Sequence, residues 1–418
     1  IKELFSSPKH LDILGEYSGR ITTAWKRLVT VDNPGFHVRN SFGDIFVSWL
    51  DGVQGTHGVQ SHSMALRTIK RFRNLTDPTD PMIQAMGQPE MLNAYRGAKK
   101  AGTMPESHNT VLFKHHGKDI TIGDIYAMYV NEGLLSGWAN TEFAANFKKP
   151  GNMVASKVGG NVAKMQQGIL HFSEAREDVF RLAHFIDVIR KSPIKDLNVA
   201  AAEAGARVRK FHFDYSDFTM TEKVLFARVF PFYKWTRKAF PLMVESLFAK
   251  PGKMMLYPKA QAGVAAASGY DTMTPDIVTP EWIQSRMLAP ILAEDGTTTY
   301  AGISLPYDAL RSAGAPGDSA VSMLNPFAKL ALGAATNTNF GSGSPAPFDL
   351  QKNLLGMFPQ TNVASKQLSG NGTPEQLASF LTGVTFTQNN DRTIQSTLLD
   401  RKEAALNAKK QQQQPAPK

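Results

Sequence analysis

The residue types that most often carry catalysis occur in this chain, but they form no recognisable catalytic motif. There is no Gly-x-x-x-x-Gly-Lys-Ser/Thr phosphate-binding loop, and Gly341-Ser342-Gly343-Ser344 lacks the strand–turn–helix context of a nucleophile elbow. Glu132 and Glu142 could form an acid pair for glycan cleavage, but two carboxylates among 36 acidic residues carry almost no information. We therefore expect no catalytic residues and no enzyme activity.

The histidines do not have the spacing of a metal site. His57 and His62 are five positions apart in a stretch rich in Gly, His and Ser, and no His-Glu-x-x-His arrangement occurs. The chain has no cysteine, which excludes disulfides, thiolate metal sites and a cysteine nucleophile. We expect solvated or hydrogen-bonded histidines, and neither a metal nor another cofactor.

The most distinctive segment runs from Asp214 to Lys253 and interleaves aromatic with basic side chains. From Lys223 to Lys259 there are eight Lys or Arg residues and one acid, Glu245. Such a segment can lie at a lipid headgroup boundary or stack on nucleic-acid bases. We favour a third interpretation, a Pro-kinked helix pair with its aromatics in the core and its cations at the rim. The candidates for membrane or nucleic-acid contact are Arg228, Phe232, Tyr233, Lys234, Trp235, Arg237, Lys238, Lys250 and Lys253.

A second compact cluster, formed by Asn33, Pro34, Arg39 and Asn40, is a structural candidate. Asp32 or Asn33 can cap the helix that follows. Arg39 can bind a phosphate or a carboxylate, and we favour a bond that ties the helix to a neighbouring acid.

Apolar periodicity predicts a chain of helices. Gly52 to Ser63 is expected to be a loop and the Gly-rich stretch 139–170 a mobile one. Val111 to Ile122 is expected to hold a short hairpin. The predicted helices cover 1–30, 36–53, 64–75, part of 82–110, 173–191 and 196–212.

Local signals predict where two of the later helices begin and are interrupted. Ser173 has the position of an N-cap, with acids in the turn that follows. Thr219 and Glu222 match a capping box. Pro231 and Pro241 are expected to kink or divide the aromatic stretch.

These patterns predict a mainly α fold: a multi-helix body with kinked aromatic-rich helices, and an extended, loop-rich C-terminal arm. A chain of 418 residues exceeds what one core usually serves. The predicted segments are an N-terminal helical segment (1–75), a mixed helical and loop segment (76–170), a central helical segment with the aromatic-basic helices (171–262), and an arm with a disordered Gln/Pro tail (263–418).

The net charge of +10, with a pI near 9.5, suggests a polyanionic partner such as packaged DNA, RNA or an anionic membrane surface. The alternative is a solvated surface that happens to be basic, because no dense Lys/Arg block occurs. No apolar run approaches the length of a membrane span, and Ile1 to His10 lacks the apolar stretch of a signal peptide. A first residue other than Met fits either a chain cut from a longer precursor or a numbering that starts at the first ordered residue.

Several segments, in this order, resemble a large helical domain of phage polyvalent proteins, which include internal and ejection proteins of tailed phages. Asn33-Pro-Gly-Phe-His-Val-Arg-Asn-Ser-Phe-Gly-Asp44 is similar to its Asn-Pro-x-Phe-x-x-Arg-Asn-x-x-x-Asp segment, and Glu177 to Phe185 is similar to one of its helices. Further similar segments are Asp214 to Thr219 with Glu222, Arg228 to Trp235, Leu324 to Phe327 and Leu381 to Val384.

The resemblance implies a virion role, inside the capsid or near the portal, and it supplies no catalytic residues. We expect a structural virion protein of the ejected or cargo type, in a multi-copy assembly that contacts portal, capsid or internal proteins and packaged double-stranded DNA. One alternative is a minor capsid or portal-proximal protein that is retained in the shell. Another is a membrane-active conduit component that meets the host membrane surface during genome delivery.

Overall fold

The computed structural model divides the chain into two compact units. The first unit combines Ile1–Asp32, Asn40–Glu245 and Leu305–Ala328, and the second combines Asn33–Arg39, Ser246–Ser304 and Lys329–Lys418. The residues that the structure describes are 22, 25–30, 32–72, 75, 77–86, 88, 90–135, 159–213, 218–219, 222, 230, 232–267, 288–292, 298–303, 305–306, 310, 324, 326–338, 348–357, 363, 366–370, 372–389, 398–399 and 402.

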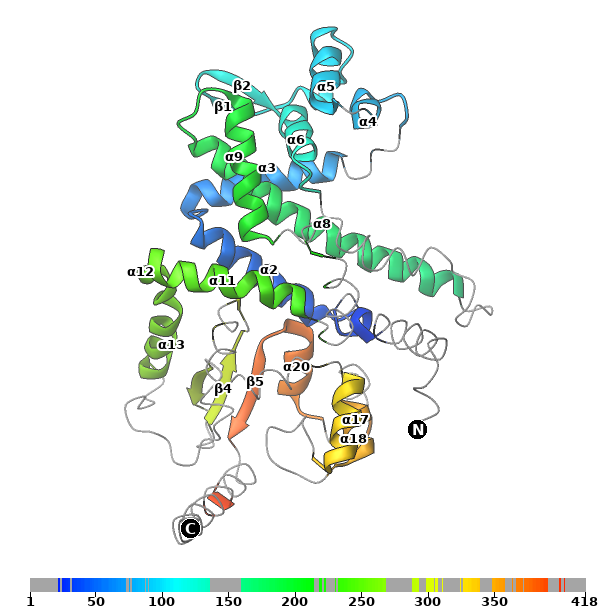
Figure 1. The fold of residues 1–418 in the computed structure, drawn as a ribbon, viewed down its shortest axis with the longest axis vertical. Helices are drawn as coiled ribbons and strands as arrows, with labels where there is room; N and C mark the ends of the chain where they lie inside the picture. The colour runs from blue at the N-terminus through cyan, green and yellow to red at the C-terminus, as the bar shows by residue number, and fades with distance from the viewer. Residues whose placement is uncertain are drawn as a thin grey trace, which may run out of the picture. The chain divides into compact units, whose positions relative to one another are not determined.

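The first unit is built almost entirely from helices (Figure 1). α3 packs along α8, and α8 packs against α9, so these three helices form its centre. Its elements are α2 (Pro34–Leu50, from Asn40 onward in this unit), α3 (Gly55–Phe72), α4 (Pro81–Met86), α5 (Met91–Lys100), the 3-10 turn η2 (Glu106–His108), β1 (Val111–His115), β2 (Lys118–Thr121), α6 (Ile122–Asn131), α8 (Gly159–Lys191), α9 (Leu197–Phe211) and α11 (Tyr233–Ala249, up to Glu245 in this unit).

The core of this unit lies where α6, α8 and α9 meet α3. Tyr129 and Phe185 are fully buried and pack edge to face, with ring centroids 5.8 Å apart. Phe72 stacks on Tyr126 with centroids 4.4 Å apart and an interplanar angle of 11°. The buried apolar residues of this cluster run from Ala65 to Val208, so it draws on three of the four predicted segments.

The predicted hairpin is confirmed, and its turn has a plain cause. β1 and β2 pair antiparallel, with His115 opposite Lys118. His116 and Gly117, the two residues between them, both have positive φ, at 47° and 84°. A two-residue hairpin turn of this kind matches the right-handed twist of the strands, and glycine adopts it at little cost.

Side-chain caps fix the starts of the helices around the core. The Asp196 carboxylate accepts hydrogen bonds from the backbone N–H groups of Asn198 and Val199, so α9 begins close to its predicted start. Thr121 and Asp124 form a reciprocal capping box at the start of α6.

The second unit combines short helices with a three-stranded antiparallel sheet in the order β3-β4-β5. α13 contacts β3, and α20 contacts β5. The sequence did not predict this sheet. The elements are α12 (Pro251–Met254), α13 (Leu256–Ala267), β3 (Ala289–Leu292), β4 (Thr298–Gly302), α17 (Pro326–Thr336, from Lys329 onward in this unit), α18 (Leu350–Met357), α20 (Pro374–Thr382) and β5 (Thr385–Asn389).

The mainly α prediction is confirmed, but the loop predicted between Gly52 and Ser63 is wrong, because α3 begins at Gly55. Its glycine and serine are not loop signals here. Gly58, Ser61 and Ala65 are small and buried on one face of α3, and small side chains let a helix approach its neighbours closely. Ser61 also donates a hydrogen bond to Asp187 of α8.

Two further boundaries differ from the prediction. Ser173 is not an N-cap, because α8 already begins at Gly159 and Ser173 is buried inside the helix; the acid Glu177 pairs with Arg181 one turn further on. Of the two outcomes predicted for Pro241, a divided helix is wrong, because α11 continues through this residue, whereas a kink stays a prediction. Of the stretch predicted to be mobile, the part from Gly159 is helical, whereas 139–158, Pro231 and most of the first predicted helix lie outside the described residues.

Candidate functional site

The densest group of chemically active side chains in the described residues is a charged cluster in the first unit, which we call the buried junction. Asp44 and Ser48 lie one turn apart on α2, and Asp51 follows in the turn directly after this helix. Their partners come from α8 and from the end of α9. The junction consists of Asp44, Ser48, Asp51, Arg176, His184, Arg207 and His212.

Asp51 lies at one end of the junction, between a histidine and an arginine. One carboxylate oxygen lies 2.7 Å from His184 Nε2 and 2.8 Å from Arg207 Nε. Arg207 Nη2 also donates to the backbone carbonyl of Asp51 at 2.9 Å. Burial by itself raises the pKa of Asp51, but the hydrogen bonds and charges of these two partners outweigh it and lower the pKa to about 2.

Asp44 anchors the other end of the junction. Its Oδ2 lies 2.6 Å from Arg176 Nη1, and its Oδ1 lies 3.6 Å from His212 Nδ1. Burial raises the pKa of Asp44, but His212 and Arg176 together outweigh it, and the pKa lies below its ordinary value. The carboxylate therefore stays ionised and pairs α2 with α8.

His212 completes a serine–histidine–aspartate arrangement, since Ser48 Oγ lies 3.1 Å from its Nε2. This order of groups is also that of hydrolase triads. However, only 1% of Ser48 is exposed, so no substrate can reach its hydroxyl in this conformation. Burial lowers the pKa of His212 to about 4, which leaves the ring neutral at pH 7.

A second layer of charges surrounds this arrangement. Arg181 Nη2 lies 2.6 Å from Glu177 Oε1 and donates to the carbonyl oxygen of His212 at 3.1 Å. Burial raises the pKa of Glu177. Tyr129 donates to Asp178 at 3.4 Å. These bonds join α8 to α6 and to the end of α9, so the network determines how the helices pack.

Sequence reasoning missed this junction as a site. The spacing of Asp44, Ser48 and Asp51 was visible, but nothing local showed that positions 176, 184, 207 and 212 lie opposite them. The expectation of hydrogen-bonded histidines is confirmed at His184. Among the described residues, no three His, Asp or Glu side chains are placed to hold a metal ion.

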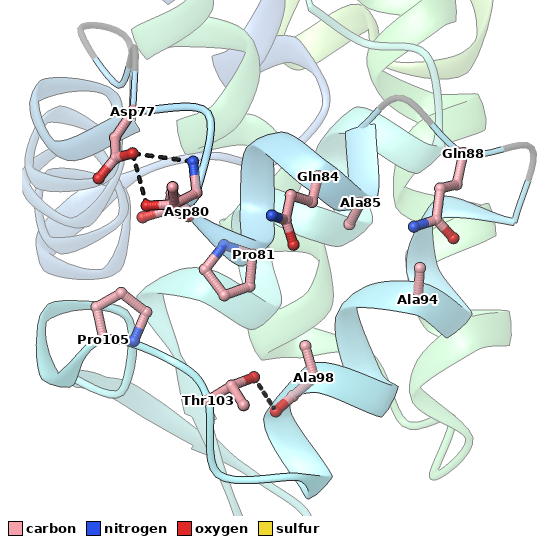
Figure 2. Close-up of a pocket in the computed structure, with 11 residues that line it drawn as sticks. Asp77, Asp80, Pro81, Gln84, Ala85, Gln88, Ala94, Ala98, Thr103 and Pro105 are labelled. Atoms are coloured by element: carbon pink, nitrogen blue, oxygen red, sulfur yellow. Dashed lines mark hydrogen bonds between the residues drawn. The ribbon is translucent and has the colours of Figure 1, made fainter.

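A polar pocket of about 430 Å³ lies apart from the junction, beside α4 and α5 (Figure 2). Its carboxylates already have partners: Asp77 accepts from the backbone and hydroxyl of Thr79, and Asp80 accepts from Met82 N–H and faces His108 at 3.3 Å. These bonds stabilise the loop before α4 and leave no convergent set of groups for a ligand.

The structure ties several of the predicted contact residues to neighbours within the chain. Arg237 Nε lies 2.9 Å from Glu222 Oε1, and its guanidinium lies 4.8 Å from the centre of the Phe218 ring. Lys238 also lies over Phe218, at 5.7 Å, and Tyr233 donates to Glu222. Glu222 in turn makes the predicted capping bonds with Thr219.

The remaining contact candidates have different surroundings. Phe232 is 43% exposed, and its ring meets Trp25 edge to face at 6.2 Å. Lys234 and Trp235 are half-buried in the first turn of α11. Lys250 and Lys253 belong to the second unit, and Arg228 lies outside the described residues.

The structural candidates around Asn33 lie at the start of α2. Pro34 is its first residue. Asn33 is buried, but its Oδ1 accepts no hydrogen bond in the described part of the chain, so Asn33 does not cap the helix. Capping by Asp32, the other residue predicted for this role, stays a prediction. Arg39 and Asn40 are half-buried on α2, and burial lowers the pKa of Arg39. An acidic partner for Arg39 stays a prediction.

Comparison with known proteins finds no matching family model, no similar curated protein and no similar solved structure. The resemblance to the phage helical domain therefore stays a prediction. None of the described helices is long and apolar enough to cross a membrane.

Proposed function

We propose that this chain is a structural protein of a tailed-phage virion, carried inside the particle in several copies, where it contacts DNA or other virion proteins. Under this proposal the chain has no catalytic role. Its task is to present a stable helical body to its neighbours.

The observation that carries the proposal is that the segments resembling the phage helical domain supply residues of the buried junction and of the layer around it. Asp44 ends the first segment, and Arg181 and His184 belong to the second. Their partner His212 lies outside the resembling segments, two residues before the third. All four contribute to the buried junction or to the layer around it. Segments far apart in sequence thus share one packing task, as expected of a domain that is defined by its helical scaffold.

The chemistry of the junction also favours a scaffold over a catalyst. Its carboxylates are bonded to arginine and histidine side chains, and its serine is buried. Buried charges that are paired in this way are costly to separate, so they restrict how the helices can pack. Such restriction suits a protein whose neighbours must fit a fixed shape.

The surface charge supports DNA as one of the partners. Arg67, Lys70 and Arg71 are exposed along α3, and the chain as a whole carries +10. Exposed cations release counterions when they meet phosphates, which favours binding to packaged DNA.

Peptide mass spectrometry of purified particles of the phage that encodes the chain tests this proposal. We expect the chain in full particles at a constant ratio to the capsid protein across a density gradient. Its loss from particles triggered to eject their DNA identifies an ejected protein, whereas its retention identifies a minor capsid or portal-proximal protein. Absence from full particles, or clearing by the purified chain on a cell-wall zymogram, contradicts the proposal.

A further inference from the structure

The end of α11, together with α12 and α13, exposes an unusual amount of apolar side chain for so short a segment. Phe248 is 80% exposed, Leu256 53%, Met255 44% and Leu247 37%. We call the segment Ser246–Ala267 the apolar corner. Figure 1 shows α12 at the bend between the end of α11 and α13.

The apolar corner is an ordered turn, so its exposed side chains are not the result of a frayed end. Backbone hydrogen bonds run from Lys253 N–H to the Lys250 carbonyl and from Met255 N–H to the Pro251 carbonyl. Met254 is fully buried, and Ala265 is 1% exposed, so one side of the corner is anchored while the other is open.

The charge of the corner has one sign. Lys250, Lys253 and Lys259 lie within it, and no Asp or Glu occurs from position 246 to position 267. The nearest preceding acid, Glu245, pairs with Lys210 at 2.6 Å. Lys259 is exposed, and Lys250 and Lys253 are half-buried. An exposed apolar surface beside an exposed lysine, in a segment without acids, fits a partner that is anionic and also accepts apolar side chains.

We infer that the apolar corner is a docking surface for an anionic lipid bilayer. A bilayer interface takes up Phe, Leu and Met side chains below a layer of anionic headgroups that attract lysine. DNA offers the anionic charge but no apolar layer for Phe248. A second copy of the same corner would bring lysines against lysines.

Vesicle flotation with the purified full-length chain tests this inference. We expect binding to vesicles containing about one third phosphatidylserine, weaker binding in raised salt, and about tenfold less binding to pure phosphatidylcholine. A chain that stays at the bottom of the gradient, or that binds both vesicle types equally, overturns the inference.

A matched pair of double variants locates the surface. Phe248→Ser with Lys259→Glu removes an apolar anchor and reverses one charge in the corner. Leu368→Ser with Lys366→Glu makes the same chemical change at another exposed position, where Leu368 is 89% exposed. We expect about a tenfold loss of vesicle binding for the first pair and little change for the second. Equal behaviour of the two pairs overturns the assignment.

A spectroscopic readout remains decisive even if the first double variant folds poorly. Because the chain has no cysteine, Phe248→Cys and Leu368→Cys each accept a single polarity-sensitive dye. Anionic vesicles should shift the emission to the blue at position 248 and leave position 368 unchanged. No shift at 248 overturns the inference. The virion proposal is tested on particles, so either proposal can fail without the other.

Discussion

His184 Nε2 lies 2.7 Å from Asp51 Oδ2, and both side chains are almost completely buried. The two residues are 133 positions apart and belong to α8 and to the turn after α2. Arg207 of α9 shares the same carboxylate oxygen. One carboxylate therefore joins three helical regions, and removing it should weaken all of these connections at once.

Asp51→Asn should destabilise the first unit by about 3 kcal/mol, because a buried histidine and a partly buried arginine lose their carboxylate partner. Urea unfolding, followed together with hydrogen exchange of peptides from α8 and α9, measures this loss. The matched control is Asp119→Asn on the hairpin, where Asp119 pairs with Lys114 at 3.5 Å and both side chains are largely exposed. We expect Asp119→Asn to lower the free energy of unfolding by less than about 1 kcal/mol. Equal effects would show that the Asp51 bonds contribute little.

The pKa of His212 predicts a stability that depends on pH. Its folded pKa is about 4, against an ordinary value of 6.5, so the unfolded chain binds more protons between these values. The contribution of the neutral, buried His212 ring to the free energy of unfolding is fully present above pH 6.5. This contribution is lost as the pH falls towards 4. The loss amounts to about 3 kcal/mol, since one pKa unit corresponds to about 1.4 kcal/mol.

Melting temperatures measured from pH 7 to pH 4 check this prediction. His212→Gln keeps a hydrogen-bonding group beside Ser48 and should flatten the profile in this window. His57→Gln changes an exposed histidine and should leave the wild-type profile intact. If His212→Gln retains the full pH dependence, groups other than His212 cause it.

Gly383 and Gly370 offer a test of backbone crowding within the second unit. Both have positive φ, at 68° and 70°. A Cβ on Gly383 would meet the Gly35 carbonyl oxygen and the side chain of Arg39, whereas a Cβ on Gly370 would meet no atom within 4 Å. Gly370→Ala should lower the free energy of unfolding by only about 1 kcal/mol, which is the cost of holding an alanine in the left-handed conformation.

Gly383→Ala should destabilise the second unit several times more than Gly370→Ala. The added methyl group must also push the end of α20 away from the first turn of α2. Limited proteolysis between α20 and β5, compared with the wild-type rate, measures this separation. Similar cleavage rates in the two alanine variants would contradict the close approach of Gly35 and Gly383.

Measurements of DNA binding can distinguish the exposed cations of α3 from the cations of α11 that contact other side chains. The double variant Arg67→Gln with Lys70→Gln should reduce the dependence of the binding constant for non-specific duplex DNA on salt concentration. The expected reduction corresponds to the loss of about two phosphate contacts. Arg237→Gln with Lys238→Gln removes the same charge, but these cations are held by Glu222 and Phe218, and we expect a smaller change. Titrations at several salt concentrations give the slope, and the reverse order of effects would favour α11 as the DNA contact.

Features determined by nearby residues could be predicted from the sequence alone. The hairpin follows from apolar residues on both sides of His116 and Gly117, and the cap at Glu222 follows from Thr219 three positions before it. The helices α2 and α9 follow from apolar periodicity. In each case the interacting residues lie within a few positions of one another.

Tertiary structure decided the rest. Gly58 and Ser61 have the residue types of a loop, but both are buried in α3, and Ser61 bonds to Asp187 of α8. The acids near Ser173 resemble a helix start, although α8 begins at Gly159. The buried junction brings Asp44 to Arg176, which is 132 positions away. No local propensity encodes such a pair. It forms because charged side chains that are removed from water need partners of opposite charge, and only the packed helices determine which partners lie within reach.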